Sequence, residues 1–281
     1  MSKRIVIQGG YGAFHEMAAL QYFDNEPIEI LPRDTFKDLM VALKQDKADH
    51  GIMAIENSLA GSILPNYSLL KDSPMMIIGE IYMRIHQNLV ALPGQKISEI
   101  REVFSHPMAI LQCQVFFDQY DDIKLIESMD TALSAKKIRD ENLEGIAAIA
   151  SNLAAEKYEL EIIAAGIETN KMNYTRFLIL GNGQDALAAR EGMNKASLHF
   201  ALSHDIGSLS KILSILSYYD INLSKIQSMP IIGEDWEYQF YVDVEFTDLE
   251  LYEQSVKAIK PFTSDLGILG EYKRGKSIIN V

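Results

Sequence analysis

The alternation of short apolar runs with helical patterns over the first 180 residues constrains the fold most strongly. Runs such as RIVIQ (4–8), IEILPR (28–33) and GIMAI (51–55) have the length of buried strands and are too short for helices. The segments between them place apolar residues at helical spacing, as in 14–22 and 36–43. Strands that alternate with helices indicate an α/β fold with a largely parallel sheet.

The pattern changes after residue 180. Residues 181–195 contain glycines, no apolar periodicity and no β-branched run, so we interpret them as a linker. Beyond the linker, strand and helix patterns follow in the order βαββαβ, which is the ferredoxin-like arrangement. The segment Gly233-Glu234-Asp235 is a hairpin signal between two of these strands.

Charge and cysteine content exclude several classes of protein. The formal net charge of −13 argues against a nucleic-acid partner, although a local group of donors still permits an anionic small molecule. The single cysteine, Cys113, forms no intramolecular disulfide and builds no thiolate zinc site, and HExxH and P-loop motifs are absent. No apolar stretch suits a signal peptide or a membrane helix. We therefore expect a cytoplasmic protein that binds neither membrane nor metal.

Two polar segments follow predicted strands. The turn GGYGAF (9–14) lacks GxGxxG, but a glycine-rich turn before a helix offers backbone N–H groups to an anion. A tight strand-to-helix turn is an equally good interpretation. The segment IENSLAG (55–61) follows a strand, where α/β folds bind ligands, although an ordinary polar loop is the alternative.

A third segment, FSHPMAILQC (104–113), begins a predicted helix. Ser105 taken alone is best interpreted as the N-cap of that helix. The helix dipole disfavours a charged His106 at this place, so we expect a neutral, hydrogen-bonding imidazole. Gln112 lies later on the same helix.

The fourth segment, NYTRF (173–177), opens an apolar run. The hydroxyl of Thr175 can donate and accept from a stiff side chain, and the planar fork of Arg176 suits a carboxylate. Alternatively, Arg176 pairs with an acidic side chain and Thr175 faces solvent. Spacing alone does not decide between the two.

Together and in this order, GGYGAFHEMAA, AIENSLAGSI, SHPMAILQC and NYTRFLIL resemble the signature blocks of the prephenate dehydratase family. The βαββαβ unit resembles the ACT regulatory domain of that family. The family's catalytic domain is similar to a type II periplasmic-binding protein, with two α/β lobes between which the chain crosses twice. The resemblance therefore implies a catalytic domain at 1–180 (lobe one about 1–78 and 163–180, lobe two about 79–162), a linker at 181–195 and an ACT domain at 196–274.

The implied reaction is the decarboxylating dehydration of prephenate to phenylpyruvate in phenylalanine biosynthesis, driven by aromatisation and needing no cofactor or metal. Thr175 is expected to hydrogen-bond or protonate the leaving hydroxyl. Carboxylate binding is assigned to Arg176, Ser58, Asn57 and the glycine-rich turn. The implied catalytic set is Thr175, Arg176, Ser58, Asn57, His106 and Gln112. Further substrate contacts are expected from Gly10, Gly12, Ala13, Phe14, Glu56, Ser105, Asn173 and Phe177.

The chain departs from the family pattern in two places. Ala13 stands where the family usually has threonine, a change known from relatives that act on arogenate, so the preferred substrate stays open. The usual G-A-L and E-S-R-P effector elements read Gly207-Ser208-Leu209 and Gln227-Ser228-Met229-Pro230 here. The resemblance implies phenylalanine as an allosteric effector, bound between ACT domains of a homodimer or homotetramer, and we expect altered affinity. The expected effector contacts are Gly207, Ser208, Leu209, Asn222, Leu223, Gln227, Ser228, Met229 and Pro230.

Two alternatives to a prephenate dehydratase remain. One is an arogenate dehydratase. The other is a non-catalytic small-molecule-binding protein of the same two-lobed fold, since a fold does not by itself fix a function.

Overall fold

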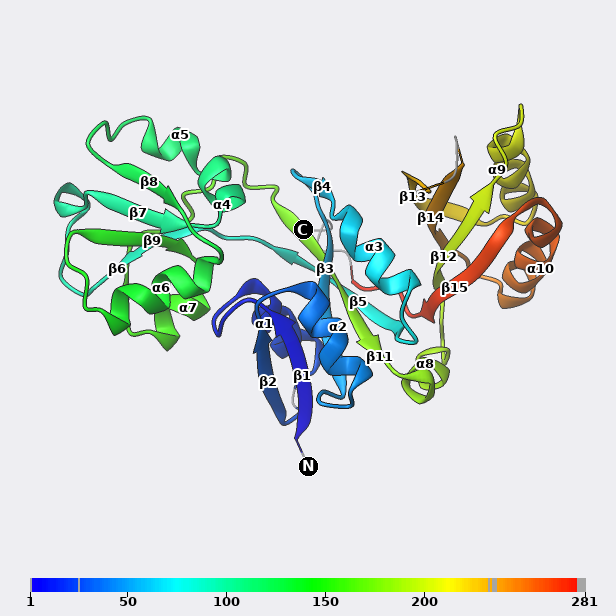
Figure 1. Cartoon of the computed structure of the whole chain (residues 1–281), viewed down its shortest axis with the longest axis horizontal. Coiled ribbons are helices and arrows are strands. Elements are labelled where there is room, and N and C mark those ends of the chain that lie inside the picture. The colour runs from blue at the N-terminus through cyan, green and yellow to red at the C-terminus, as the bar shows by residue number, and fades with distance from the viewer. Residues whose placement is uncertain (1, 25, 232, 234–236, 277–281) are drawn as a thin grey trace. The chain divides into compact units, whose positions relative to one another are not determined.

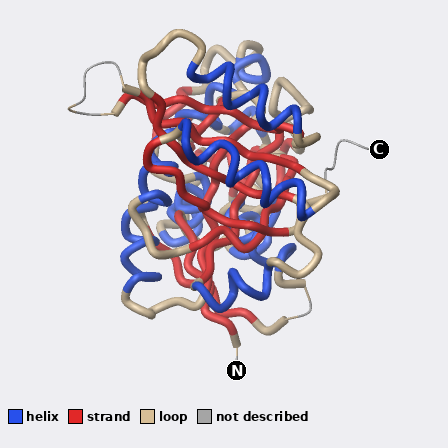
Figure 2. Tube along the Cα trace, turned by 90° about the vertical axis from the view of Figure 1, so that its right-hand side faces the viewer, coloured by secondary structure: helices blue, strands red, loops and turns tan. Residues whose placement is uncertain are grey.

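A computed structural model describes residues 2–24, 26–231, 233 and 237–276 (Figures 1 and 2). The chain divides into two compact units. Among the described residues, one unit contains those up to Gly61 together with Ile81–Phe177, and the other contains Ser62–Glu80 and those between 178 and 276. In the described part of the chain no helix is long and apolar enough to cross a membrane.

The first sheet has the strand order β2-β1-β3-β11-β5, with the short strand β4 beside β3. Strand β1 pairs in parallel with both β2 and β3, as the alternating pattern predicts. Strands β5 and β11 each contribute residues to both units. The strands are β1 (Lys3–Gln8), β2 (Ile28–Arg33), β3 (His50–Asn57), β4 (Gly61–Ser62), β5 (Met76–Arg84) and β11 (Tyr174–Gly181).

Helices α1 (Phe14–Tyr22) and α2 (Phe36–Lys44) connect the first three strands. The hydroxyl of Thr35 caps α2 by accepting from the backbone N–H of Asp38 over 3.1 Å. Leu39 and Leu43 of α2 are fully buried, which explains why the helical periodicity of this segment was informative.

The second sheet has the order β10-β6-β9-β7-β8. Alternate residues of its strands reach two separate cores: Val90 and Ala148 pack with α6 and α7, and Leu89 and Ala147 pack with α4 and α5. The chain passes between the two sheets after β5 and again before β11, so the predicted two-lobed α/β fold is confirmed. The strands are β6 (Asn88–Ala91), β7 (Glu102–Ser105), β8 (Lys124–Glu127), β9 (Ile146–Ala150) and β10 (Glu161–Ala164); the helices are η1 (Ile97–Glu99), α4 (Pro107–Gln112), α5 (Gln114–Phe117), α6 (Thr131–Asp140) and α7 (Asn152–Lys157).

The C-terminal segment forms the predicted βαββαβ unit. Its sheet has the order β13-β14-β12-β15 with antiparallel neighbours, which is the ferredoxin-like arrangement. Glu234 and Asp235 of the predicted hairpin lie outside the described residues. The elements are β12 (Lys195–Leu202), α9 (Ser208–Tyr218), β13 (Asn222–Pro230), β14 (Tyr238–Glu245), α10 (Leu249–Ile259), η2 (Lys260–Phe262) and β15 (Ser264–Tyr272).

Two details of this half differ from the sequence pattern. The helical spacing places Leu209, Ile212, Leu213 and Leu216 on one face. Ile212 and Leu216 of α9 are buried in the core, but Leu213 is 38% exposed. The predicted linker contains helix α8 (Gly183–Ala189), which begins at a capping box formed by Asn182 and Asp185.

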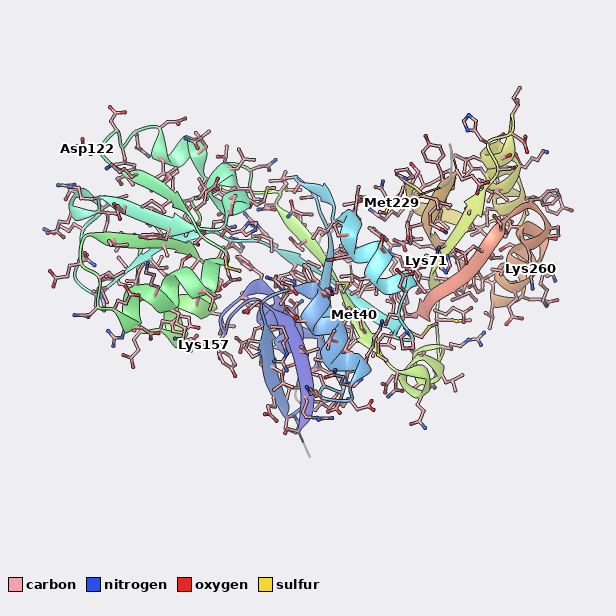
Figure 3. All side chains as sticks on the ribbon, viewed as in Figure 1. Met40, Lys71, Asp122, Lys157, Met229 and Lys260 are labelled. Atoms are coloured by element: carbon pink, nitrogen blue, oxygen red, sulfur yellow. The ribbon has the colours of Figure 1, made fainter. Side chains whose placement is uncertain are left out.

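Helix α3 (Leu64–Lys71) packs on this four-stranded sheet within the second unit. The rings of Tyr67 and Tyr241 lie 4.9 Å apart, and Lys71 (labelled in Figure 3) donates to Gln239 Oε1 over 2.8 Å. Strand β5 also approaches closely, because a Cβ at Gly270 would lie 2.2 Å from the carbonyl oxygen of Ile77. The sheet is therefore covered by helix α3 and strand β5 in addition to its own helices.

A buried ion pair fixes β5 to the start of β12. The ammonium of Lys195 lies 3.0 Å from both carboxylate oxygens of Glu80, and both side chains are buried. Glu80 Oε1 also accepts from the backbone N–H of Gly275 over 3.1 Å, and Glu245 lies 3.7 Å from Lys195. These contacts offset part of the cost of removing both charges from water.

Candidate active site

Asn57, at the end of β3, has an amide orientation that its own backbone fixes. Its Oδ1 accepts from the N–H groups of Leu59 (3.0 Å) and Ala60 (2.9 Å), so Nδ2 points the opposite way. There Nδ2 lies 2.8 Å from Asn173 Oδ1 and 3.0 Å from Thr175 Oγ1. Asn57 is therefore the donor to Thr175.

Thr175 is the second residue of β11, and its side chain is only 8% exposed. The alternative in which Thr175 faces solvent is therefore wrong. Because Thr175 Oγ1 accepts from Asn57, its own proton points away from Asn57. Among the described residues this proton has no acceptor, which leaves a stiff, partly enclosed hydroxyl able to donate to a ligand.

The amide of Gln112, at the end of α4, is also oriented by hydrogen bonds to its oxygen. Its Oε1 accepts from Asn173 Nδ2 over 2.9 Å and from Gln87 Nε2 over 3.4 Å. Its Nε2 group has no acceptor among the described residues and is available as a donor. Asn173 is fully buried and uses both polar atoms to join Asn57 to Gln112, so it positions these residues and offers no free group to a substrate.

Two predicted serines have their hydroxyl protons engaged. Ser58 Oγ donates to the carbonyl of Met172 and accepts from the N–H of Tyr174, both over 2.9 Å. Ser105 is fully buried and donates to the carbonyl of Ile149 over 2.8 Å. The interpretation of Ser105 as an N-cap is wrong, because His106 caps α4.

His106 lies exposed at the start of α4. Its Nδ1 accepts from the N–H of Met108 over 3.2 Å, which requires that this nitrogen carry no proton. His106 thus makes a hydrogen bond at the start of α4.

The glycine-rich turn does not keep its N–H groups free. Gly12 donates to Glu16 Oε2 over 2.5 Å, and the N–H of Gly10 bonds to the carboxyl of Asp130. The expectation of an open anion site at these two groups is wrong because the chain's own carboxylates occupy them. Burial raises the pKa of Asp130, and hydrogen bonds from Leu133 and Gly10 oppose that shift.

The same turn packs against α7. Ser151 Oγ donates to the carbonyl of Gly12 over 2.6 Å, and a Cβ at Gly12 would lie 2.6 Å from Cα of Ala154. Gly12 has φ of +85°, so both its conformation and this contact require glycine. Ala13 is buried in the adjoining core, while Phe14 and Glu56 are partly buried.

Arg176 and Phe177 do not join the amide network of Thr175. Consecutive strand residues project to opposite faces, and the guanidinium of Arg176, 4% exposed, lies 5.9 Å from the ring centroid of Tyr82. Phe177 is buried and packs edge-on against His15, with ring centroids 5.0 Å apart. Phe177 therefore offers no surface to a ligand.

Burial also shifts the pKa values of two side chains, His15 and Cys113. It lowers the pKa of His15 to about 3 and raises the pKa of the Cys113 thiol to about 12. A thiol of that pKa is not a nucleophile near neutral pH. His15 Nε2 has no hydrogen-bond partner in the described part of the chain.

The predicted effector residues fall into two places in one chain. Strands β12 and β13 both run antiparallel to β14, so Gly207–Leu209 and Gln227–Pro230 lie at the same end of the sheet. Met229, labelled in Figure 3, belongs to that group. Asn222 and Leu223 lie at the opposite end and line a cavity of 380 Å³. The rest of its lining is Leu213, Leu216, Ser217, Asp220 and Ile221.

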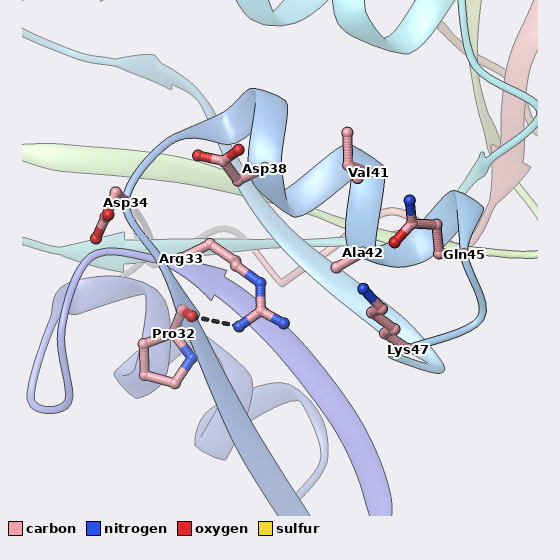
Figure 4. A pocket seen from close by; sticks show the side chains of 8 residues that line it. All are labelled: Pro32, Arg33, Asp34, Asp38, Val41, Ala42, Gln45 and Lys47. Atoms are coloured by element: carbon pink, nitrogen blue, oxygen red, sulfur yellow. Dashed lines mark hydrogen bonds between the residues drawn. The ribbon is translucent and has the colours of Figure 1, made fainter.

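Another 380 Å³ cavity, between β2 and α2, contains none of the predicted site residues (Figure 4). Arg33 lines it, but Nη1 of this residue donates to the carbonyl of Pro32 over 2.6 Å. The amide network around Thr175 is therefore the better candidate for the site. The described residues contain no group of three or more His, Cys, Asp or Glu arranged to hold a metal ion.

Residues 5–185 match the family model described as Prephenate dehydratase. The chain belongs to the prephenate dehydratase family. Arogenate dehydratase 5, chloroplastic, of Arabidopsis thaliana is 36% identical over 288 residues, covering 96% of this chain and 67% of that protein. The family supports a dehydratase activity and leaves the choice between prephenate and arogenate open.

Two solved structures share the fold of this family member over nearly its whole length. The prephenate dehydratase from Arthrobacter aurescens in complex with L-Phe has a TM-score of 0.85 and 26% identity, covering 96% of this chain and 90% of that one. GqqA, described as a novel type of quorum quenching acylases, has a TM-score of 0.87 and 28% identity, covering 99% and 100%. Both similarities extend through the C-terminal βαββαβ unit.

Proposed function

We propose that the protein converts prephenate to phenylpyruvate, water and carbon dioxide. The electron pair of the bond to the leaving carboxylate enters the ring, and the bond to the ring hydroxyl breaks as the ring becomes aromatic. The departing hydroxide takes up one proton, supplied by the solvent, and leaves as water. No electrons are gained or lost overall, so the balance needs no oxidant or reductant.

This proposal rests on the hydrogen bond that the Thr175 hydroxyl accepts from Asn57. Since Asn57 donates to Thr175 Oγ1 over 3.0 Å, Thr175 can give its own hydrogen bond to the leaving oxygen. Negative charge develops on that oxygen, and a donor fixed beforehand in a partly enclosed site stabilises it most effectively. Gln112 Nε2 supplies a second donor from the other lobe.

The substrate carboxylates need positive charge or N–H donors. Arg176 carries a permanent charge next to Thr175 in the chain, but its buried side chain projects to the other face of β11. His106 offers an exposed imidazole at the start of α4. Ser58 contributes by holding residues 172–174 in place, since its own proton is already donated.

Arogenate is the second candidate substrate. Two observations favour it: alanine at position 13, and the 36% identity with an arogenate dehydratase. The two substrates differ in the side chain, where arogenate carries an ammonium group and prephenate a keto group. Kinetics on both substrates with one enzyme preparation separates the candidates, and the ratio of the two kcat/KM values gives the preference.

We further propose that residues 196–274 are an ACT domain that binds phenylalanine in a homo-oligomer. The βαββαβ topology supports this, as does the similarity to a dehydratase solved with L-Phe. Titration calorimetry with phenylalanine should give a heat of binding and a change in activity. A titration without heat and without a change in activity would contradict the effector role.

The decisive experiment is a phenylpyruvate assay of the purified protein with prephenate, run beside the variant Thr175→Val. Turnover by the natural protein and its loss in the variant support the proposal. A protein that binds prephenate without converting it or arogenate would instead be a binding protein of this fold.

A further inference from the structure

Glu168 is a buried carboxylate that the proposed chemistry does not use. It lies in the loop between β10 and β11, and its side chain is 1% exposed. Its Oε2 accepts from the backbone N–H of Gln87 over 2.9 Å. Its Oε1 has no hydrogen-bond partner among the described residues; His86 Nδ1 lies 3.7 Å away and Lys171 Nζ 3.9 Å away.

A buried carboxylate with one unbonded oxygen is costly for the folded protein, so its position calls for a physical reason. The residues around it belong to the two segments that connect the lobes. Ile167, next to Glu168, donates to the carbonyl of Gln87 over 2.7 Å. Glu168 and Ile167 therefore bind both backbone groups of Gln87 and hold the two connecting segments together.

The side chain of Gln87 carries this constraint to the site. Its Nε2 donates to Gln112 Oε1, and the N–H of Thr169 donates to the backbone carbonyl of Gln112 over 2.8 Å. Gln112 is thus contacted at its side chain by Gln87, from one connecting segment, and at its backbone by Thr169, from the segment that contains Glu168. With Oε1 of Gln112 held in this way, Nε2 is turned outward as a donor.

We propose that Glu168 is a positioning residue for the dehydration, acting through Gln87 to orient the amide of Gln112. It does not touch the substrate. The inference rests on the proposed function, because its kinetic consequence is measured on that reaction. It adds a residue that neither the sequence motifs nor the predicted catalytic set contains.

The test is a double-mutant cycle of Glu168→Gln and Gln112→Ala. Glu168→Gln keeps the size of the side chain but replaces a charge-assisted hydrogen bond to Gln87 with a weaker neutral one. We expect kcat to fall about tenfold, because the Nε2 donor of Gln112 is no longer well oriented. KM should stay within about twofold, because the groups that bind the substrate are unchanged. In the Gln112→Ala background, Glu168→Gln should cause no further loss.

Glu161→Gln is the matched control. Glu161 also accepts from a backbone N–H, that of Gly94 over 2.7 Å, but lies on β10 away from the network. This variant should keep the natural kcat. If Glu168→Gln does not fold, Gln87→Leu is the second variant. It removes the side-chain hydrogen bond to Gln112 and keeps the bond from the backbone N–H of residue 87 to Glu168. It should lower kcat by about the same factor as Glu168→Gln.

The proposal is overturned if Glu168→Gln keeps kcat within about twofold, or if it causes the same loss with and without the Gln112 side chain. Failure of the proposed function is seen separately, as absence of turnover by the natural protein. A readout free of turnover is the side-chain amide resonance of Gln112, assigned by its disappearance in Gln112→Ala. It should shift in Glu168→Gln and stay in place in Glu161→Gln, and an unshifted resonance in both would also overturn the proposal.

Discussion

The Nδ2 group of Asn57 lies 3.0 Å from Oγ1 of Thr175, although 118 positions separate the two residues in the chain. The direction of this bond is fixed by two backbone N–H groups that occupy the other end of the Asn57 amide. A threonine that accepts one hydrogen bond and keeps its proton for another is suited to assist a departing hydroxide.

Thr175→Val should lower kcat by about a hundredfold or more, because valine has the same shape and lacks the donor. The melting temperature should change little, since Asn57 Nδ2 retains Asn173 as an acceptor. Steady-state kinetics and thermal unfolding on one preparation check this. Thr247→Val, at an exposed position of the C-terminal unit, is the control and should keep full activity. Unchanged kcat in Thr175→Val would remove the hydroxyl from the mechanism.

Asn57→Asp should be nearly as damaging. A carboxylate accepts only, so the Thr175 proton would turn toward residue 57 and away from the substrate. We expect kcat to fall about a hundredfold with the fold intact. The control is Asn170→Asp, where the asparagine uses only its Oδ1, as the acceptor from the N–H of Met172. Equal kinetics for the two variants would contradict the assigned direction of the hydrogen bond.

Lys195→Met should destabilise the protein by about 3–5 kcal/mol, because Glu80 would remain buried and charged without the ammonium of Lys195 beside it. Adding Glu80→Gln should recover part of that loss, since the buried charge is removed. Urea unfolding of the single and double variants measures both effects. Lys3→Met, which breaks an exposed pair with Glu26, should change stability by less than about 1 kcal/mol. A double variant no more stable than Lys195→Met would argue against an uncompensated charge.

His15 should make stability depend on pH. Burial lowers its pKa in the folded state to about 3, against about 6.5 in an unfolded chain. As pH falls below about 6.5 the unfolded chain takes up the proton first. The contribution is therefore complete above that pH and is lost progressively toward pH 3, reaching about 2 kcal/mol of destabilisation at pH 5. His15→Leu should lose less stability between pH 7 and 5 than the natural protein. His204→Leu, at an exposed position, should follow the natural curve, and parallel curves for all three would contradict the role of His15.

Lys225 should take part in the response to phenylalanine. It lies on β13, the strand that ends in Gln227–Pro230, and its Nζ donates to Ser62 Oγ over 2.9 Å. Ser62 lies in β4, four positions after Ser58. Lys225→Met should therefore reduce the effect of phenylalanine on kcat by at least about threefold, with basal kcat retained. Lys257→Met, on the exposed face of α10, should respond as the natural protein does. An unaltered response in Lys225→Met would show that this contact transmits nothing.

Periodicity predicted β1, β2, β3 and the βαββαβ order, because the buried strands are continuous apolar runs such as Ile5–Ile7. It predicted no strand at β4, β8 or β10. It did not predict α3 or α8. Helix α3 is eight residues long with Pro65 in its first turn, and α8 buries no residue, so neither shows an apolar stripe. Cys113 ends α4 after six residues, which divides the predicted long helix into two.

The residues of the candidate site came from a resemblance, and their arrangement could not be derived from spacing. Asn57, Gln112 and Thr175 lie on three separate elements: Asn57 bonds directly to Thr175, and Asn173 joins Asn57 to Gln112. Ser105, Asn173 and Phe177 have the residue types of a ligand site, but burial and internal hydrogen bonds occupy them. Glu168 and Gln87 were missed because a single Glu or Gln in a connecting loop follows no periodic pattern.

The contact between Glu80 and Lys195 limits how this protein can be recombined. A fragment that ends at residue 180 would contain Glu80 without Lys195. A C-terminal module grafted onto a relative would contain Lys195 without Glu80. Exchange of C-terminal modules within the family should therefore succeed only when positions 80 and 195 are exchanged together. The alternative is to replace both with uncharged side chains of similar volume.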